Sequence, residues 1–329
     1  MPARGTGCYL GVDLGGTLTK IGLSSPEGEL LAMESVPTEG EKGPGHIVEA
    51  ISRISSELLG KAELSRSSLL GVGIGSPGPI DAERGRIIET PNLRWKDVPL
   101  REMVSGAVGA RAALDNDANA AALGEWWKGA GVGSKSLVCF TLGTGVGGGI
   151  VIDGRIWHGA SGVAGELGHM TIEVDGRRCP CGNYGCLEAY ASATAISRRA
   201  REGIERGRAS SLLRAVGNRL GEITAEQVSR QAMEGDPFCR EVMTETARYL
   251  SVGVANMLNI LNPEIVVIGG GVTLAGSILF EPLLEGVRER AFPAALDGVR
   301  IVPAALGTRA GLIGAIGVIK QAVEGDVVP

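Results

Sequence analysis

The chain of 329 residues is 44% apolar but only 4% aromatic, and its formal net charge is -5. This length and apolar content suit one or two globular domains with a substantial core. No Lys/Arg-rich run argues for nucleic-acid binding, and neither a signal-peptide core nor a run of about 18 uncharged apolar residues occurs. We therefore expect a cytoplasmic protein without nucleic-acid or membrane partners.

Apolar strand-like runs and helical spacings alternate along the chain. Strands are predicted over residues 9–13, 20–25, 30–36, 69–76, 110–117, 136–145, 147–157 and 264–271, and helices over 46–59, 98–108, 118–127 and 308–320. Alternation of this kind is typical of an α/β fold with largely buried sheets.

Two segments, 11–23 and 140–152, share the order strand, Gly/Thr-rich turn and return strand. The repetition indicates a duplicated domain with one such hairpin in each lobe. The glycines lead into strands instead of helices, which excludes a Rossmann dinucleotide site, and no GxxxxGK[ST] loop occurs.

Glycines in these turns allow successive backbone N–H groups to point at an anion. Asp13 ends the first strand, where it could hold a metal-bound water, and Thr17 and Lys20 offer a hydroxyl and a cation to phosphate. The alternative is a pair of tight hairpins with an incidental aspartate. A further glycine cluster at 269–271 favours phosphate binding.

The segment 165–188 holds three of the six cysteines and one of the three histidines. Three thiolates and one imidazole suit tetrahedral Zn²⁺, and four protein ligands leave no open position, so we expect a structural ion. The alternative is a set of unrelated thiols. The ligands would be His169, Cys179, Cys181 and Cys186, whereas Cys8, Cys139 and Cys239 are expected to be ordinary residues and His46 and His158 surface or capping residues.

Motifs along nearly the whole chain resemble the ROK family (repressors, open reading frames, sugar kinases). They are DLGGT (13–17), GSPGPID (75–81), DNDANAAALGE (115–125), TLGTGVGGG (141–149), GELGH (165–169), CPCGNYGCLE (179–188) and IGGG (268–271). Within the family the chain looks most like the bacterial glucokinases.

The resemblance implies an actin-like, hexokinase-type fold with two lobes built from duplicated ribonuclease-H-like domains and a ligand cleft between them. The small lobe would comprise residues 1–115, with the C-terminal helix 307–329 packing back on it. The large lobe would comprise 116–306, with the zinc loop at 165–188. Family members are commonly homodimers or homotetramers, and we expect the same here.

The resemblance also implies ATP- and Mg²⁺-dependent phosphorylation of glucose at the 6-hydroxyl, with Asp117 as the catalytic base. Asn116 and Asp117 could instead be helix caps alone. The sugar-binding positions carried over from the family are Asn116, Asp117, Glu166, His169 and Glu188, together with Gly78 and Asn92. The ATP site would involve Asp13, Gly15, Gly16, Thr17, Lys20, Thr144, Gly145, Gly147, Gly269 and Gly270.

Two positions depart from family patterns. Leu18 stands where many members have Lys after GGT, so the role of Lys20 is less directly implied. Pro79 stands where the family's N-acetylmannosamine kinases have Arg, which favours an unsubstituted hexose.

Several alternatives remain open from the sequence. The substrate could be another hexose or an N-acetylhexosamine (mannose, fructose, N-acetylglucosamine or N-acetylmannosamine), and polyphosphate could replace ATP. A sugar-responsive regulator of the same family would need a helix-turn-helix before Asp13, which only 12 residues precede. A non-enzymatic zinc module would leave the DND segment and both glycine turns unexplained.

Overall fold

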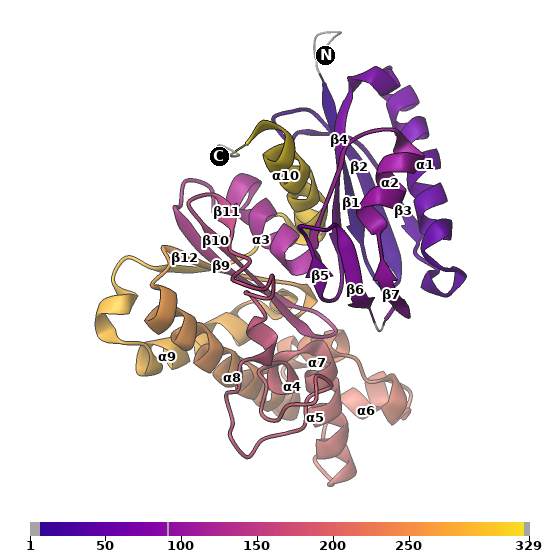
Figure 1. The fold of residues 1–329 in the computed structure, drawn as a ribbon. Helices are drawn as coiled ribbons and strands as arrows, with labels where there is room; N and C mark the ends of the chain where they lie inside the picture. The colour runs from indigo at the N-terminus through magenta and orange to yellow at the C-terminus, as the bar shows by residue number, and fades with distance from the viewer. Residues whose placement is uncertain (1–6, 91, 326–329) are drawn as a thin grey trace. The chain divides into compact units, whose positions relative to one another are not determined.

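The structure, a computed structural model, describes residues 7–90 and 92–325 (Figure 1). Two five-stranded sheets have matching strand orders, β3-β2-β1-β4-β8 and β11-β10-β9-β12-β13. The first sheet comprises β1 (Cys8–Leu14), β2 (Leu18–Ser24), β3 (Leu30–Pro37), β4 (Leu69–Ser76) and β8 (Ala112–Asn116). The second comprises β9 (Ser136–Leu142), β10 (Val146–Ile152), β11 (Arg155–Ile156), β12 (Ile265–Gly269) and β13 (Arg300–Pro303). The matching orders agree with the predicted duplication.

A small antiparallel sheet follows β4 in the chain. It contains β5 (Ile80–Asp81), β6 (Arg86–Thr90) and β7 (Trp95–Val98). Trp95, the first residue of β7, is buried and donates its indole N–H to Gly40 O at 2.8 Å. This hydrogen bond fastens the sheet to the segment before α1 (Pro44–Lys61).

The parallel strands of the first sheet end at one edge. In the register, Asp13 of β1 pairs with Gly75 of β4, and Gly75 pairs with Asp115 of β8. Because parallel strands present their carboxyl ends on the same side, the residues that follow them gather there. This edge carries the predicted residues Asp13, Gly78 and Asn116.

Helix α10 (Ala310–Glu324) contacts β1, β4 and α3 (Asp117–Lys128), whereas α1 and α2 (Leu100–Val108) cover the other face of the sheet (Figure 1). The approach of α10 is close because glycines face it. An ideal Cβ on Gly73 would lie 1.7 Å from Ala315 O, and one on Gly314 would lie 1.6 Å from Ala120 O.

The contacts divide the chain into two compact units. Unit 1 comprises Met1–Leu137, Gly149–Gly165 and Ala305–Pro329, and unit 2 comprises Val138–Gly148 and Glu166–Ala304. Helix α10 groups with unit 1, and so does α3, which the lobe boundary expected from the sequence assigns to the other lobe. The lobe boundaries themselves stay a prediction.

Unit 2 contains most of the helices. They are α4 (Glu188–Ala191), α5 (Ala193–Glu205), α6 (Leu212–Ala215), α7 (Ala225–Met233), α8 (Pro237–Leu261) and α9 (Ser277–Arg290). Helix α8 packs on α9 and α7, and its N-cap is Asp236, whose Oδ1 accepts from Cys239 N–H at 2.8 Å. Within the described ranges, no helix has the length and apolar character needed to cross a membrane.

Candidate functional site

Asp13 lies beside a cation and a glycine in unit 1. Lys20 Nζ lies 3.2 Å from Asp13 Oδ2 and donates to Thr308 O at 2.7 Å. Lys20 therefore joins β2 to the segment before α10 and lies against the carboxylate. Its phosphate contact stays a prediction. An ideal Cβ on Gly311 would lie 2.7 Å from Asp13 Cγ, so the carboxylate needs glycine at that position.

In the first glycine turn, between β1 and β2, some backbone polar groups already form hydrogen bonds within the protein. Gly15 N–H donates to Leu18 O at 3.1 Å, and Gly15 O accepts from Thr38 Oγ1 at 2.7 Å. A Cβ on Gly15 would lie 2.5 Å from Leu18 O, which explains the glycine. Gly16 and Thr17 are exposed at the tip.

Asn116 caps helix α3, as the alternative helix-cap interpretation predicts. Its Oδ1 accepts from the N–H groups of Ala118 at 2.9 Å and Asn119 at 3.2 Å. Its Nδ2 donates to Gly78 O at 3.2 Å. The amide therefore holds the helix start against the turn after β4.

Asp117 is the first residue of α3, and its Oδ1 accepts from Ala118 N–H at 2.8 Å. Backbone N–H groups and the helix dipole stabilise a carboxylate at this position. An acceptor carboxylate held in place is also what a general base requires. The two roles are compatible.

The next carboxylate is one that the sequence analysis did not single out. Asp115 is only 4% exposed, and its Oδ2 lies 2.7 Å from His158 Nε2. This hydrogen bond outweighs desolvation and raises the pKa of His158. The sequence signal was the aspartate at the end of a buried strand, directly before Asn116, but nothing local connected it with His158.

Asn92 is exposed near the first glycine turn. An ideal Cβ on Gly16 would lie 3.7 Å from Asn92 Cβ. Asn92 also lines an open cavity of about 390 Å³ together with Glu41, Leu93 and Arg94. The structure thus brings a predicted sugar contact and a predicted phosphate turn together within unit 1.

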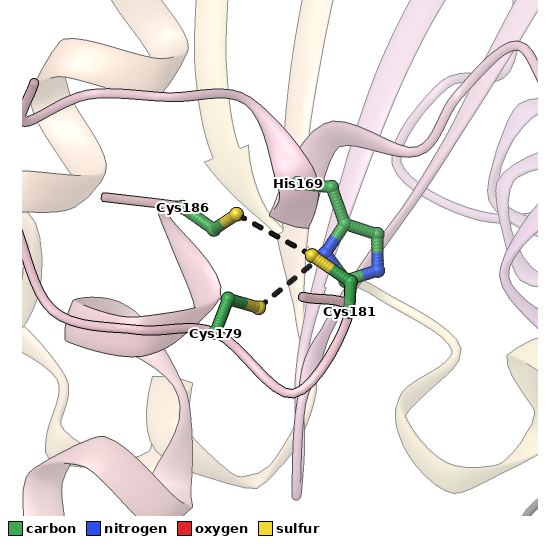
Figure 2. Close-up of side chains that lie close together, drawn as sticks. All are labelled: His169, Cys179, Cys181 and Cys186. Atoms are coloured by element: carbon green, nitrogen blue, oxygen red, sulfur yellow. Dashed lines mark hydrogen bonds between the residues drawn. The ribbon is translucent and has the colours of Figure 1, made fainter. Parts of the chain in front are cut away.

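The predicted metal ligands meet in unit 2. Their donor atoms all lie within 4.8 Å of one another. Cys179 Sγ lies 3.7 Å from His169 Nδ1, and Cys181 Sγ lies 3.7 Å from Cys186 Sγ. Dashed lines mark both contacts in Figure 2. In a tetrahedral zinc site with Zn–S of about 2.3 Å and Zn–N of about 2.0 Å, neighbouring donor atoms are roughly 3.5–3.8 Å apart. The donor set and these two contact distances therefore fit this ion.

The thiols of this cluster would have to lose their protons to bind a cation. Burial raises the pKa of Cys179 to about 12, so its thiol would stay protonated at neutral pH without one. A coordinated metal ion deprotonates a thiol outright. Binding would therefore release protons and weaken at low pH.

Glu188 connects the metal cluster with the second glycine turn. Its Oε2 accepts from Val146 N–H at 3.0 Å, and its Oε1 lies 3.7 Å from Cys179 Sγ. Across the same contact, a Cβ on Gly168 would lie 1.9 Å from Val146 O. The GELGH segment and the turn before β10 are therefore packed without room for a side chain.

The other predicted sugar-binding residues of unit 2 lie beside this cluster. Glu166 Oε2 lies 3.9 Å from His169 Nε2, the ring nitrogen that does not face Cys179. The side chains of Glu166 and His169 are 50% and 36% exposed. Both therefore combine a fixed backbone with access to solvent.

The remaining predicted phosphate residues lie on the turns of the second sheet. Thr144 O accepts from Thr194 Oγ1 at 2.7 Å, which ties the turn to the start of α5. Gly270 has φ of +92°, and a Cβ there would lie 2.3 Å from Leu142 O. The Gly269–Gly271 segment therefore packs against the end of β9, and Gly147 lies at the start of β10.

The chain is similar to known proteins over nearly its full length. The model described as the ROK family matches residues 9–322. A glucokinase of Halalkalibacterium halodurans is 42% identical over 314 residues, covering 95% of this chain and 95% of that protein.

Solved structures agree with this similarity. The ROK hexokinase from Thermus thermophilus has a TM-score of 0.82 at 34% identity, covering 96% of this chain and 98% of that chain. A ROK family glucokinase from Streptomyces griseus, in complex with glucose and AMPPNP, has a TM-score of 0.79 at 34% identity, covering 94% and 98%. The predicted actin-like, hexokinase-type α/β fold is confirmed, and the chain belongs to the ROK family.

Proposed function

We propose that the protein is an ATP-dependent glucokinase that transfers a phosphoryl group to the 6-hydroxyl of glucose. The similarity to the Halalkalibacterium halodurans and Streptomyces griseus glucokinases supports this activity. The observation that carries it in this chain is the β8–α3 junction, where Asn116 and Asp117 are fixed by the first N–H groups of α3.

Asp117 would accept the proton of the attacking hydroxyl. Its carboxylate is held at the helix start, so little reorganisation is needed when the hydroxyl loses its proton. Asn116 is oriented by its cap bonds and its bond to Gly78 O, and it would bind another sugar hydroxyl. Gly78 and Asn92 are further sugar contacts in this proposal.

Unit 2 holds the other sugar-binding residues of this proposal, Glu166, His169 and Glu188. Hydroxyl groups donate to carboxylates and accept from an imidazole N–H, so these side chains suit a polyol. Zinc would be held by His169 Nδ1 and the thiolates of Cys179, Cys181 and Cys186. The ion would fix the loop, leaving His169 Nε2 available for substrate.

When bound, ATP supplies the phosphoryl group and Mg²⁺ neutralises its charge. In unit 1, Asp13 would hold a water of the metal ion, with Lys20 fixing the carboxylate, while Gly15, Gly16 and Thr17 would face phosphate oxygens. In unit 2, the predicted phosphate and nucleotide contacts are Thr144, Gly145, Gly147, Gly269 and Gly270.

A coupled assay of ADP release with Mg-ATP tests the activity. The panel contains glucose, mannose, fructose, N-acetylglucosamine and N-acetylmannosamine, and a parallel arm replaces ATP with polyphosphate. We expect strong turnover with glucose and ATP. Folded, zinc-loaded protein that phosphorylates none of these sugars would contradict the proposal, and turnover with another sugar only would change its substrate.

The Asp117→Asn variant tests the base. We expect folded protein that still binds glucose but has kcat lowered by about 10²- to 10⁴-fold, because a general base contributes that much. Kinetics are measured beside glucose binding by calorimetry. Rates equal to those of the wild type would exclude Asp117 as the base.

A further inference from the structure

A buried carboxylate lies directly before the proposed sugar-binding segment. Asp115 Oδ1 accepts from Asn116 N–H at 2.7 Å and from Asn119 Nδ2 at 3.1 Å. These two hydrogen bonds fix the first turn of α3, while Oδ2 faces His158. The two oxygens of one carboxylate therefore join the α3 start to a segment far along the chain.

His158 is a charge partner of this buried carboxylate, at 2.7 Å. A carboxylate has no proton to give, so His158 Nε2 carries the shared one. Burying an unpaired carboxylate is costly, and removing one partner of a buried pair leaves that cost uncompensated. Asp115 and its bonds to α3 therefore depend on His158.

The segment around His158 is itself fixed. Its carbonyl oxygen accepts from Ala164 N–H at 3.0 Å, and Gly159 and Gly162 have φ of +69° and +79°. An ideal Cβ on Gly162 would lie 3.7 Å from Ile80 O, so this loop lies near β5. His158 is thus presented to Asp115 by a turn with its own hydrogen bond.

We propose that His158 is a positioning residue for phosphoryl transfer, which holds Asp115 so that Asn116 and Asp117 keep the orientation needed to bind and deprotonate the sugar. This inference rests on the proposed glucokinase activity. His158 acts through Asp115, and removing its N–H donor loosens the start of α3 without touching the glycine turns.

The test compares His158→Phe, which lacks a donor, with His158→Gln, which keeps one. We expect His158→Phe to lower kcat by about 10- to 100-fold and to raise KM for glucose, because small misplacements of reacting groups cost that much. KM for ATP should stay within about two-fold, since ATP would bind elsewhere. His158→Gln should recover part of the loss.

His46 provides a matched control. Its side chain is also 37% exposed, and its Nε2 lies 2.9 Å from Glu39 Oε2. Glu39, unlike Asp115, lies at the surface, with its side chain 39% exposed. His46→Phe should therefore leave kcat and both KM values unchanged.

A double-mutant cycle with Asp115→Asn separates positioning from general destabilisation. The effect of His158→Phe on kcat should largely disappear in the Asp115→Asn background, because the two residues act as a unit. Should His158→Phe fail to fold, the cycle is run with His158→Gln. Additive effects in either cycle would overturn the inference.

Two other outcomes are decisive. Wild-type kinetics in folded His158→Phe would overturn this inference but not the proposed function. Equal rises in KM for glucose and ATP, accompanied by a lowered Tm, would do the same. Wild-type protein that does not phosphorylate glucose would instead overturn the proposed function.

Discussion

The carboxylate of Asp13 occupies space that a side chain at position 311 would take, because an ideal Cβ on Gly311 would lie 2.7 Å from Asp13 Cγ. Lys20 holds the same carboxylate from another side. The position of Asp13 is therefore set by Lys20, its partner in the β1–β2 hairpin, and by Gly311, which lies far along the chain.

The Gly311→Ala substitution should displace this carboxylate. We expect kcat to fall by about 10- to 100-fold and more Mg²⁺ to be needed for half-maximal rate, because Asp13 would no longer face the metal-bound water. The rate is measured over a Mg²⁺ titration at saturating ATP and glucose.

Gly106→Ala in α2 is the matched control, since a Cβ there meets nothing within 4 Å. That variant should keep the wild-type rate and Mg²⁺ dependence. A Gly311→Ala protein with the same Mg²⁺ dependence as the wild type would show that Asp13 has no part in metal binding.

At the scale of elements, the metal loop depends on more than its ligands. Arg177 donates to both carboxylate oxygens of Glu202 on α5, at 2.7 Å and 2.6 Å, and its N–H donates to Tyr190 Oη at 2.6 Å. These bonds fix one side of the loop, and a metal ion held by the four predicted ligands would fix the other.

Cys181→Ser should remove one ligand and release the metal ion. We expect loss of bound zinc and destabilisation of at least about 3 kcal/mol, because metal-binding energy contributes to folding. Metal content by mass spectrometry and denaturant unfolding measure both effects. Tyr184→Ser, an exposed position in the same loop, should change neither, and an unchanged zinc content in Cys181→Ser would exclude Cys181 as a ligand.

Local sequence patterns predicted most strands of the two five-stranded sheets and several helices, for physical reasons. They missed β5, β6, β7 and β13, and the predicted strand 147–157 is interrupted by a turn between β10 and β11. The strand β4 coincides with the apolar run 69–76, which polar and proline residues bound, and α10 starts within the predicted helix 308–320. Helix α9 was not predicted, and Pro282 inside it is a residue that usually ends a helix. Helix α8 carried usable signals, an Asp236 cap and Pro237 at its first position.

The side-chain partners in the site were harder to predict from sequence. The cysteine spacing predicted a cluster that the structure brings together, because all four ligands lie within one short segment. Lys20 with Asp13, and His158 with Asp115, are pairs set by sheet register and by loop packing across the chain. Such contacts produce no periodic pattern in the local sequence from which they could be predicted.

At the scale of the whole molecule, one buried carboxylate should influence acid stability. Asp236 is 7% exposed, which would raise its pKa, but N–H groups of Cys239 and Ser211 and the hydroxyls of Ser211 and Ser210 outweigh burial and lower the pKa to about 2. The bonds join α8 to the segment before α6.

Because the folded pKa is depressed, this contribution to stability is full above the ordinary value of 3.8 and is lost as pH falls through about 2. Asp236→Ala should lower the free energy of unfolding by about 1–2 kcal/mol at pH 7, and the deficit should shrink towards pH 2. Denaturant unfolding at both pH values measures it. Asp297→Ala, at an exposed position, should show no such pH-dependent difference, and a deficit in Asp236→Ala that is equal at both pH values would contradict the assignment.

Helix α10 is the last of the described elements in chain order, yet it packs on β1 and β4, which are among the first strands. Glu125 on α3 likewise accepts the N–H groups of Ala305 and Leu306. On a ribosome that adds about 5–20 residues per second, roughly 10–40 s pass between the synthesis of the first sheet and that of α10. Unit 2 is complete before then, so its folding can precede that of the chain's own N-terminus. The nascent first sheet, with its apolar face still uncovered, is where chaperones would be needed during synthesis.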